Sequence, residues 1–158
     1  MSLRKPDIGF IPTPPAMVKA MLDLAEVQAS DVVYDLGCGD GRIVIAAATQ
    51  FGCRGVGIDI DPVRIETART TAATKHVADQ LQFYVADLYE TDFRAATVVI
   101  LYLLPHLNLR LLPQLRQQLQ PGARIISRDF DMGDWQPERS LICTADDEEA
   151  TLYRWTIA

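Results

Sequence analysis

Cysteine is scarce in this chain, and long apolar runs are missing from it. Its three cysteines, Cys38, Cys53 and Cys143, give no even set for a disulfide framework, so we expect a reducing compartment. No apolar stretch approaches the ~20 residues of a membrane span, and the first residues lack the apolar core of a signal peptide. We therefore expect a soluble cytoplasmic protein without a membrane span.

Basic residues are also in short supply. The chain has 15 Lys and Arg against 21 Asp and Glu, which gives a formal net charge of −6. This balance disfavours nucleic acid as a partner, although it leaves a cationic partner open. The two histidines, His76 and His106, form no Ser/His/Asp or Cys/His arrangement, and no His or Cys pair has the spacing of metal ligands. We expect neither a nucleophilic triad nor a metal.

The 158 residues suit one domain, and 49% of them are hydrophobic. No repeat, low-complexity tract or linker interrupts the chain. We divide residues 1–158 only into an N-terminal arm and helix (1–29) and a ligand-binding core (30–158). Thr13 is expected to cap the helix that Pro14 and Pro15 open.

The most informative stretch runs from Val32 to Arg42. Its first five residues, Val-Val-Tyr-Asp-Leu, are apolar and β-branched apart from one acid, which predicts a buried strand. Gly37, Gly39 and Gly41 then predict a sharp turn, and the apolar run from Ile43 predicts a helix. A strand, a glycine turn and a helix form half of a nucleotide-binding unit, in which the helix N-terminus faces the ligand.

A second strand is predicted to end at Asp59, about 20 residues beyond the glycine turn, where such units place an acid on the ribose hydroxyls. The glycines read G-x-G-x-G, because Arg42 stands where a dinucleotide fingerprint has its third glycine, which here comes one residue early. This departure favours a ligand whose carboxylate and amine meet the loop over a pyrophosphate. An NAD-binding oxidoreductase remains an alternative.

The remaining elements follow from apolar runs between Pro and Gly signals. They are strands at 81–85, 96–104 and 123–127, helices at 62–76 and 111–119, and a closing hairpin of strands 141–144 and 151–156. The alternation of strands and helices predicts an α/β fold whose sheet is mostly parallel, with helices on both faces.

Two motifs, D-L-G-C-G-D-G at 35–41 and G-V-G-I-D-I-D-P at 55–62, resemble those of class I methyltransferases that use S-adenosylmethionine (SAM). PTPP at 12–15, YLLP at 102–105 and SRDFDMGDW at 127–135 are similar, more narrowly, to small bacterial relatives of mitochondrial lysine methyltransferases. Those enzymes act on the ATP synthase c-subunit and the adenine nucleotide translocase. The resemblance implies a Rossmann-like, seven-stranded sheet whose last strand is antiparallel, and SAM as the cofactor.

The resemblance also implies roles for the residues at the first two strand ends. Asp35 would hold the ammonium of SAM, and Gly37 and Gly39 would make room for its methionine part. Cys38, between them in the cofactor-binding turn, would be a small filler and not a nucleophile. Asp59 would accept both ribose hydroxyls, and Ile60 would lie against the adenine. We predict that Gly41 serves close packing instead.

At the third strand end, the resemblance places Asp87 on the adenine amino group and the Leu88 backbone N–H on the adenine ring. The alternative is that Asp87 caps the turn before Tyr89.

Tyr102 and Asp129 are the predicted catalytic residues. Many class I enzymes that methylate nitrogen have N/D-P-P-Y/F where this chain has Tyr102-Leu103-Leu104-Pro105, so an enzyme that acts on nucleobase amines is disfavoured. Tyr102 would position the acceptor amine, or it is a core tyrosine. Asp129 would form a substrate mouth with Asp131, Asp134, Phe130 and Trp135, or these residues form a solvated acidic loop.

The sequence thus predicts a SAM-dependent methyltransferase whose acceptor is a protein lysine. A small-molecule N- or O-methyltransferase is the nearest alternative, and a catalytically silent binding module is another. The entry segment Phe10 to Thr13 either folds over the cofactor or is a surface arm. The oligomeric state does not follow from the sequence.

Overall fold

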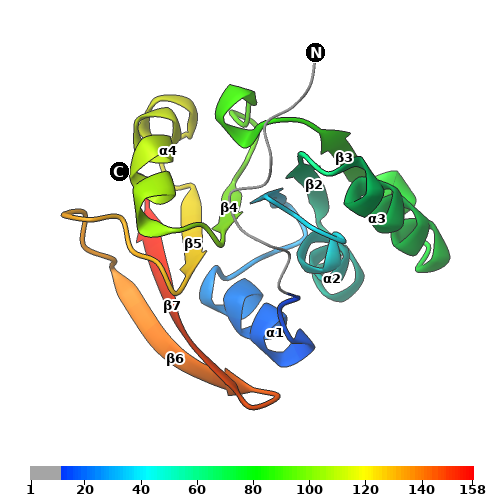
Figure 1. Ribbon diagram of the computed structural model, residues 1–158, viewed down its shortest axis with the longest axis horizontal. Helices are drawn as coiled ribbons and strands as arrows, with labels where there is room; N and C mark the ends of the chain where they lie inside the picture. Colours follow the sequence, from blue (N-terminus) through cyan, green and yellow to red (C-terminus); the bar gives the residue numbers. More distant parts are fainter. Residues whose placement is uncertain (1–11) are drawn as a thin grey trace.

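The computed structural model describes residues 12–158, which build one seven-stranded sheet with strand order β3-β2-β1-β4-β5-β7-β6 (Figure 1). The strands are β1 (Val32–Leu36), β2 (Arg54–Asp59), β3 (Leu81–Val85), β4 (Val98–Leu101), β5 (Arg124–Arg128), β6 (Arg139–Ala145) and β7 (Glu148–Thr156). The helices are α1 (Pro15–Leu24), α2 (Arg42–Phe51), α3 (Pro62–Thr74) and α4 (Pro105–Gln118), with short 3₁₀ turns η1 (Ala78–Gln80) and η2 (Leu88–Glu90).

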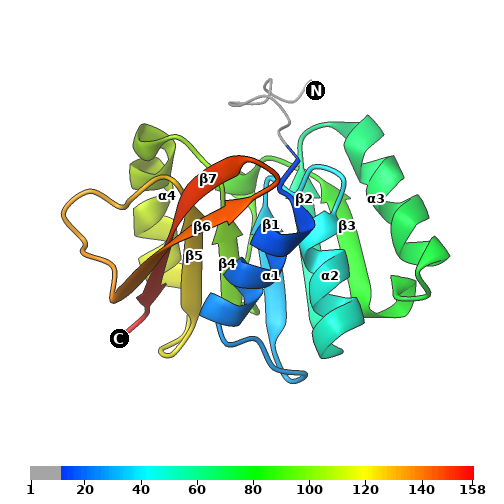
Figure 2. The ribbon, with the colours of Figure 1, turned by 90° about the horizontal axis from the view of Figure 1, so that it is seen from below.

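Strand direction confirms the predicted topology. β1 to β5 pair in parallel, whereas β7 runs antiparallel to both β5 and β6. The strand order reverses between β1 and β4, and ligands of such sheets bind there, beyond the carboxyl ends of the strands. Figure 2 shows β4 pointing toward the upper edge, with the C-terminus of the chain at the lower edge.

Helices cover both faces of the sheet, as predicted, because the strands carry apolar side chains on both faces. Val33, Val98 and Ile100 face one apolar core, which the buried sides of α1, α2 and α3 complete. Val99 and Leu101 face a second core with α4 and η2. In the described part of the chain, no helix has the length and apolar character needed to cross a membrane.

Three local predictions are wrong at their boundaries. β4 ends at Leu101, so the predicted strand is too long, and α4 begins at Pro105 rather than near Leu111. Pro105 stands in the first turn, where its missing N–H costs nothing, and the exposed Pro113 is tolerated inside the helix. Thr13 does not cap α1. Pro14 is the cap residue, and its carbonyl accepts from two backbone N–H groups of the first turn.

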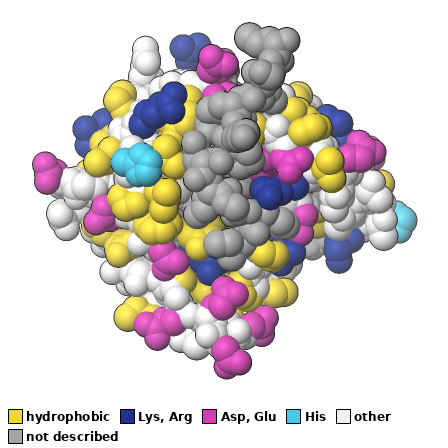
Figure 3. All heavy atoms as spheres, viewed as in Figure 1, with side chains coloured by type: hydrophobic (Ala, Val, Ile, Leu, Met, Phe, Trp, Pro, Cys, Tyr) yellow, Lys and Arg dark blue, Asp and Glu magenta, His cyan; other side chains and the backbone are white. Residues whose placement is uncertain are grey.

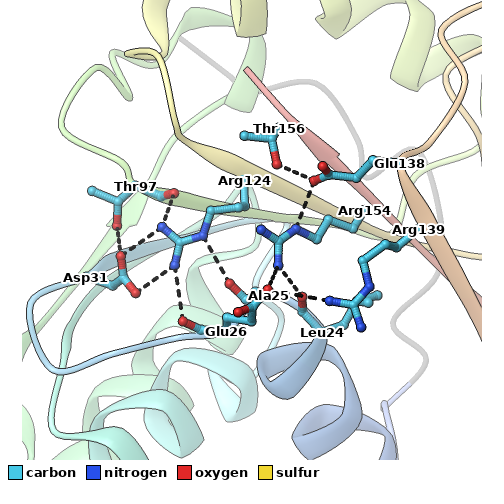
Figure 4. Close-up of polar contacts among 10 residues, drawn as sticks. All are labelled: Leu24, Ala25, Glu26, Asp31, Thr97, Arg124, Glu138, Arg139, Arg154 and Thr156. Carbon is cyan, nitrogen blue, oxygen red and sulfur yellow. Dashed lines mark hydrogen bonds and ion pairs between the residues drawn. The ribbon is translucent and has the colours of Figure 1, made fainter. Parts of the chain in front are cut away.

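A polar network fastens the amino-terminal edge of the sheet (Figure 4). Asp31, just before β1, accepts hydrogen bonds from Arg124 Nη1 (3.1 Å) and Nη2 (2.8 Å) and from Thr97 Oγ1 (2.8 Å). Arg124 Nε also donates to the Ala25 carbonyl at 3.0 Å. These contacts join the starts of β1, β4 and β5 to the end of α1.

Arg154 extends this network from β7. Its Nη1 donates to the Leu24 carbonyl (2.8 Å) and pairs with Glu26 (2.7 Å), and its Nε donates to Glu138 (3.0 Å). We call the contacts of Arg124 and Arg154 the arginine belt. It satisfies carbonyls at the end of α1 that the helix leaves without intrahelical partners.

Asp31→Asn should lower the free energy of unfolding by about 3 kcal/mol at neutral pH, because it leaves the largely buried Arg124 without its carboxylate. Burial raises the pKa of Asp31, but donors from Arg124, Gln28 and Thr97 outweigh burial and hold it below the ordinary 3.8. The stabilisation is therefore present above about pH 3.8 and is lost as the pH falls through the lower, folded-state pKa.

Urea unfolding at a series of pH values measures this effect. Asp23→Asn is the matched control, since the side chain of Asp23 is about half exposed and pairs with Lys19 on the surface of α1. Its cost should stay below about 1 kcal/mol. Equal losses for the two variants would contradict the role given to Asp31.

Candidate functional site

The glycine turn that follows β1 is closed onto β2 by backbone hydrogen bonds. The N–H groups of Gly37 and Cys38 both donate to the Ile58 carbonyl, at 2.7 and 2.9 Å. Gly37, Gly39 and Gly41 all have positive φ, which explains why the turn needs glycine. A Cβ on Gly37 would meet nothing within 4 Å, so the turn leaves open space beside this residue.

Gly41 serves close packing, as predicted. A Cβ at this position would lie 2.8 Å from the Phe83 ring and 2.9 Å from Ala68, so a side chain cannot fit. Gly57 on β2 is equally crowded, by Phe83 at 2.7 Å and by the Cys38 sulfur at 2.8 Å. Cys38 is buried, and burial raises the pKa of its thiol, which makes it an inert packing residue of the turn.

Asp59 supports the turn from the end of β2. One carboxylate oxygen, Oδ2, accepts from the Gly39 N–H at 2.9 Å, and the other, Oδ1, accepts from the Asp61 N–H at 2.9 Å. Each carboxylate oxygen has two lone pairs, so both keep acceptor capacity for a ligand. This bracing of the turn by Asp59 is a role that the sequence did not reveal.

Asp35, at the end of the buried β1, is 4% exposed. Burial raises its pKa well above the ordinary 3.8, and the charges of Asp59 and Asp40 raise it further. A buried carboxyl beside two other carboxylates favours a cationic ligand, because a positive charge would offset the cost of ionising it.

Asp87 lies at the end of β3, where it begins η2. Its Oδ1 accepts from the Tyr89 N–H at 3.0 Å, which is the capping role weighed from the sequence. Leu88 is buried, and Ile60 is partly exposed directly after Asp59. The roles of these three residues toward an adenine stay predictions.

Tyr102 follows β4 and is partly exposed. Its ring is stacked on Phe130, with centroids 5.8 Å apart and an interplanar angle of 14°. The Arg128 guanidinium lies 4.6 Å from the centroid of the same ring. The structure therefore brings the ends of β4 and β5 together at Tyr102.

Asp129 lies between Arg128 and Phe130 in the chain, directly after β5. Its Oδ1 accepts from the Thr151 N–H at 3.0 Å, and its Oδ2 lies 3.8 Å from Arg128 Nε. It is a non-glycine residue with a positive φ of 66°, held by a backbone hydrogen bond of 2.7 Å from its N–H to the Thr151 carbonyl. Its predicted catalytic role is untested by this geometry.

The remainder of the expected substrate mouth does not gather at Tyr102. Trp135 packs on Trp155, with ring centroids 6.0 Å apart, and belongs to the core under α4. Asp131 accepts from the Gly133 N–H and shapes its own turn. The two acids therefore have different partners, since Asp131 turns to Gly133 whereas Asp129 bonds to Thr151 of β7. Of the entry segment, Phe10 and Ile11 lie outside the described residues.

The sequence did not reveal the contacts that Arg42, Arg128 and Thr13 make with one another. Arg42 pairs with Asp40 of the glycine turn (Nη2 to Oδ2, 2.7 Å) and donates from Nη1 to the Thr13 carbonyl at 3.1 Å. Arg128 Nη1 donates to the Thr13 hydroxyl at 3.0 Å. An arginine beside the glycine turn and another at the end of β5 were the available signals, but both stand among acids and resemble surface charges in the sequence.

The sequence profile of the ANTKMT methyltransferase domain matches residues 35–139, which include the glycine turn, Asp59 and Tyr102. The chain belongs to this methyltransferase family. A protein-lysine N-methyltransferase of Saccharolobus islandicus (strain REY15A) is 36% identical over 96% of this chain and 95% of its own length. The human lysine N-methyltransferase of the ATP synthase c-subunit is 31% identical over 87% of this chain, which covers 58% of the human protein.

A solved structure described as an RNA methyltransferase from Salinibacter ruber, in complex with S-adenosyl-L-homocysteine (SAH), is also similar. It is 52% identical, has a TM-score of 0.88 and aligns over 93% of this chain and 94% of its own. This methyltransferase therefore uses SAM, and the oxidoreductase and silent-module alternatives are wrong.

The residues present fit SAM. The open space beside Gly37, the buried Asp35 and the free acceptor capacity of Asp59 suit the carboxylate, ammonium and ribose of this cofactor. When bound, SAM supplies a methyl group on a sulfonium, a good electrophile. In residues 12–158, no group of three or more His, Cys, Asp and Glu side chains is arranged to hold a metal ion.

Asp35→Asn should weaken SAM binding about tenfold, because it removes the buried carboxylate that is predicted to hold the ammonium of SAM. Since the pKa of Asp35 is raised, the free enzyme loses stability as the pH rises from about 3.8 through the folded-state pKa. SAM favours the ionised carboxyl, so wild-type affinity should increase over the same pH range.

Calorimetry across that range measures both effects. Asp35→Asn should abolish the pH dependence, and it should also stabilise the free enzyme at neutral pH. A variant with wild-type affinity and an unchanged pH profile would show that Asp35 does not face the cofactor.

Asp59→Ala should weaken SAH binding about a hundredfold, because it removes both the brace of the Gly39 N–H and the predicted partner of the ribose hydroxyls. Asp61→Ala is the matched control from the same loop. It removes the N-cap of α3, where Asp61 accepts from the Val63 N–H, and should cost about 1 kcal/mol of stability without changing SAH affinity. Equal affinity losses for both variants would contradict this assignment.

Proposed function

We propose that this enzyme methylates the side-chain nitrogen of lysine in a protein. The observation that carries this proposal is the similarity to a protein-lysine N-methyltransferase over 96% of this chain and 95% of that protein. The family and the human relative named for a component of ATP synthase support the same acceptor class.

The acceptor side of the site supports a lysine. Tyr102 and Phe130 offer an aromatic surface for the methylene stem and the cation of a lysine. Asp129 precedes Phe130 in the chain, and one of its carboxylate oxygens, Oδ2, is 3.8 Å from Arg128 Nε, beyond hydrogen-bond distance. A lysine must lose its proton before it attacks, and a carboxylate at the mouth draws that proton toward solvent.

Methyl transfer is an in-line displacement, which needs positioning more than chemical assistance. The nitrogen lone pair forms the new N–C bond while the S–C bond of SAM breaks, and SAH leaves with the bonding electrons. The protein has to hold sulfur, methyl and nitrogen in line and exclude water. Tyr102 at the reversal of strand order is the residue best placed to orient the acceptor.

RNA is the second candidate, because the Salinibacter ruber structure is described as an RNA methyltransferase. The charge of this chain argues against it. Net charge is −6, and Figure 3 shows Lys and Arg side chains of the described residues scattered among Asp and Glu on the face that is also seen in Figure 1. The segment at 102–105 also has no Asn or Asp that would accept from a nucleobase amine.

Labelled SAM and the enzyme, added to lysate from cells that lack this protein, distinguish the two candidates. Protease should remove the label from high-molecular-weight material, and ribonuclease should leave it in place. Mass spectrometry of the labelled peptide should then place one or more methyl groups on a lysine. A label that is sensitive to ribonuclease alone would establish RNA as the acceptor and refute the proposal.

With that acceptor in hand, Tyr102→Ala should lower kcat/KM about a hundredfold and leave SAH affinity unchanged, because positioning of the amine is lost while the cofactor site is intact. Tyr84→Ala is the control, since Tyr84 is 48% exposed on the edge strand β3. Wild-type kcat/KM in Tyr102→Ala would contradict the role of Tyr102.

A further inference from the structure

Arg128 is the buried charge of the acceptor side, and three distant parts of the chain meet at it. The residue is 4% exposed at the end of β5. Nη1 donates to the Thr13 hydroxyl (3.0 Å), Nη2 pairs with Glu148 at the start of β7 (2.9 Å), and the guanidinium lies over the Tyr102 ring. Burying a guanidinium is costly unless its partners are fixed, so these contacts define its position closely.

Thr13 also accepts a hydrogen bond from a second arginine, Arg42, which lies beside the glycine turn. It is 6% exposed, and while its hydroxyl accepts from Arg128, its backbone carbonyl accepts from Arg42 at 3.1 Å. Arg42 in turn holds Asp40 of the glycine turn with two hydrogen bonds, Nε to Oδ1 (3.1 Å) and Nη2 to Oδ2 (2.7 Å). A continuous chain of charge-assisted contacts therefore runs from Asp40 through Arg42, Thr13 and Arg128 to Tyr102.

We propose that Arg128 is a positioning residue for methyl transfer, which fixes the Tyr102 ring and couples it through Thr13 to the glycine turn. The inference rests on the proposed role of Tyr102 on the acceptor side. Planar guanidinium groups stack on aromatic rings and bond to two partners at once, so the ring and the turn share one rigid support.

One edge of the guanidinium is still unsatisfied. Within residues 12–158, Arg128 Nε has no hydrogen-bond partner, and the nearest carboxylate oxygen, Asp129 Oδ2, is 3.8 Å away. An unpaired buried donor is costly, so a small movement of Asp129 toward Nε would be favourable because it would form a hydrogen bond. Arg128 is thus placed to hold both predicted catalytic residues, Tyr102 by stacking and Asp129 by charge.

The first experiment reads the Tyr102 ring directly, with SAH as the only added ligand. The full chain is labelled with 3-fluorotyrosine, and Tyr102→Phe assigns one of the five tyrosine resonances. Arg128→Met should shift or broaden the Tyr102 line. Arg154→Met is the matched control, since Arg154 is also a largely buried arginine with two carboxylate partners, but it lies in the arginine belt. It should lower thermal stability and leave the Tyr102 line unchanged.

The second experiment measures the coupling as SAH affinity in a double-mutant cycle. Arg128→Met should weaken SAH binding about threefold to tenfold in the wild-type background and have no further effect in Arg42→Met, where the link is already broken. Thr13→Val removes only the hydroxyl, so it should reproduce the affinity loss of Arg128→Met while Arg128 still stacks on Tyr102.

Equal affinity losses for Arg128→Met in both backgrounds, or an unmoved Tyr102 line, would overturn the inference. If Arg128→Met does not fold, Thr13→Val in the wild-type and Arg42→Met backgrounds still tests the coupling, because it breaks the Thr13–Arg128 link alone. Neither readout uses a methyl acceptor, so a failure to label lysine would refute the proposed function without touching this result. If both hold, Arg128→Met should also raise the acceptor KM more than it lowers kcat.

Discussion

The closure of the glycine turn onto β2 is the interaction on which the site depends. Two N–H groups share the Ile58 carbonyl, and a third reaches the Asp59 carboxylate. A turn of three glycines has a large conformational entropy, so without this attachment it would not keep one shape. The parallel register of β1 and β2, in which Leu36 stands opposite Ile58, is what makes the attachment possible. The sheet thus positions the turn.

Much of this arrangement follows from the sequence because it depends on local signals. Buried strands at Val32–Leu36 and Arg54–Asp59 are legible as β-branched and apolar runs, and glycines with positive φ mark the turn. The end of β4 does not follow in the same way, because Tyr102 to Leu104 continue the apolar run after the pairing has stopped. Apolar character reports burial, whereas a strand also needs a neighbour to bond with.

The contacts of Arg128 and Thr13 lie beyond sequence reasoning for a different reason. These residues are separated by most of the chain, and Thr13 precedes a proline pair that signals a helix cap. Its hydroxyl has two possible partners, the first turn of α1 or a side chain from a distant strand. Only the assembled sheet, which brings the end of β5 over the start of α1, decides between them. Asp59 is a similar case, since its role toward a ribose is predicted from its place after the glycine turn, whereas its bond to Gly39 is seen only in the fold.

The arginine belt and the predicted acceptor side of the site lie at opposite ends of β5. Arg124 begins β5 and Arg128 ends it, and the interior between them is apolar apart from the buried Ser127. We therefore expect a substitution at one end of the strand to change the structure of the other end little. In evolutionary terms, residues at the acceptor end can change to suit a different methyl acceptor, while the arginine belt at the other end keeps the domain folded.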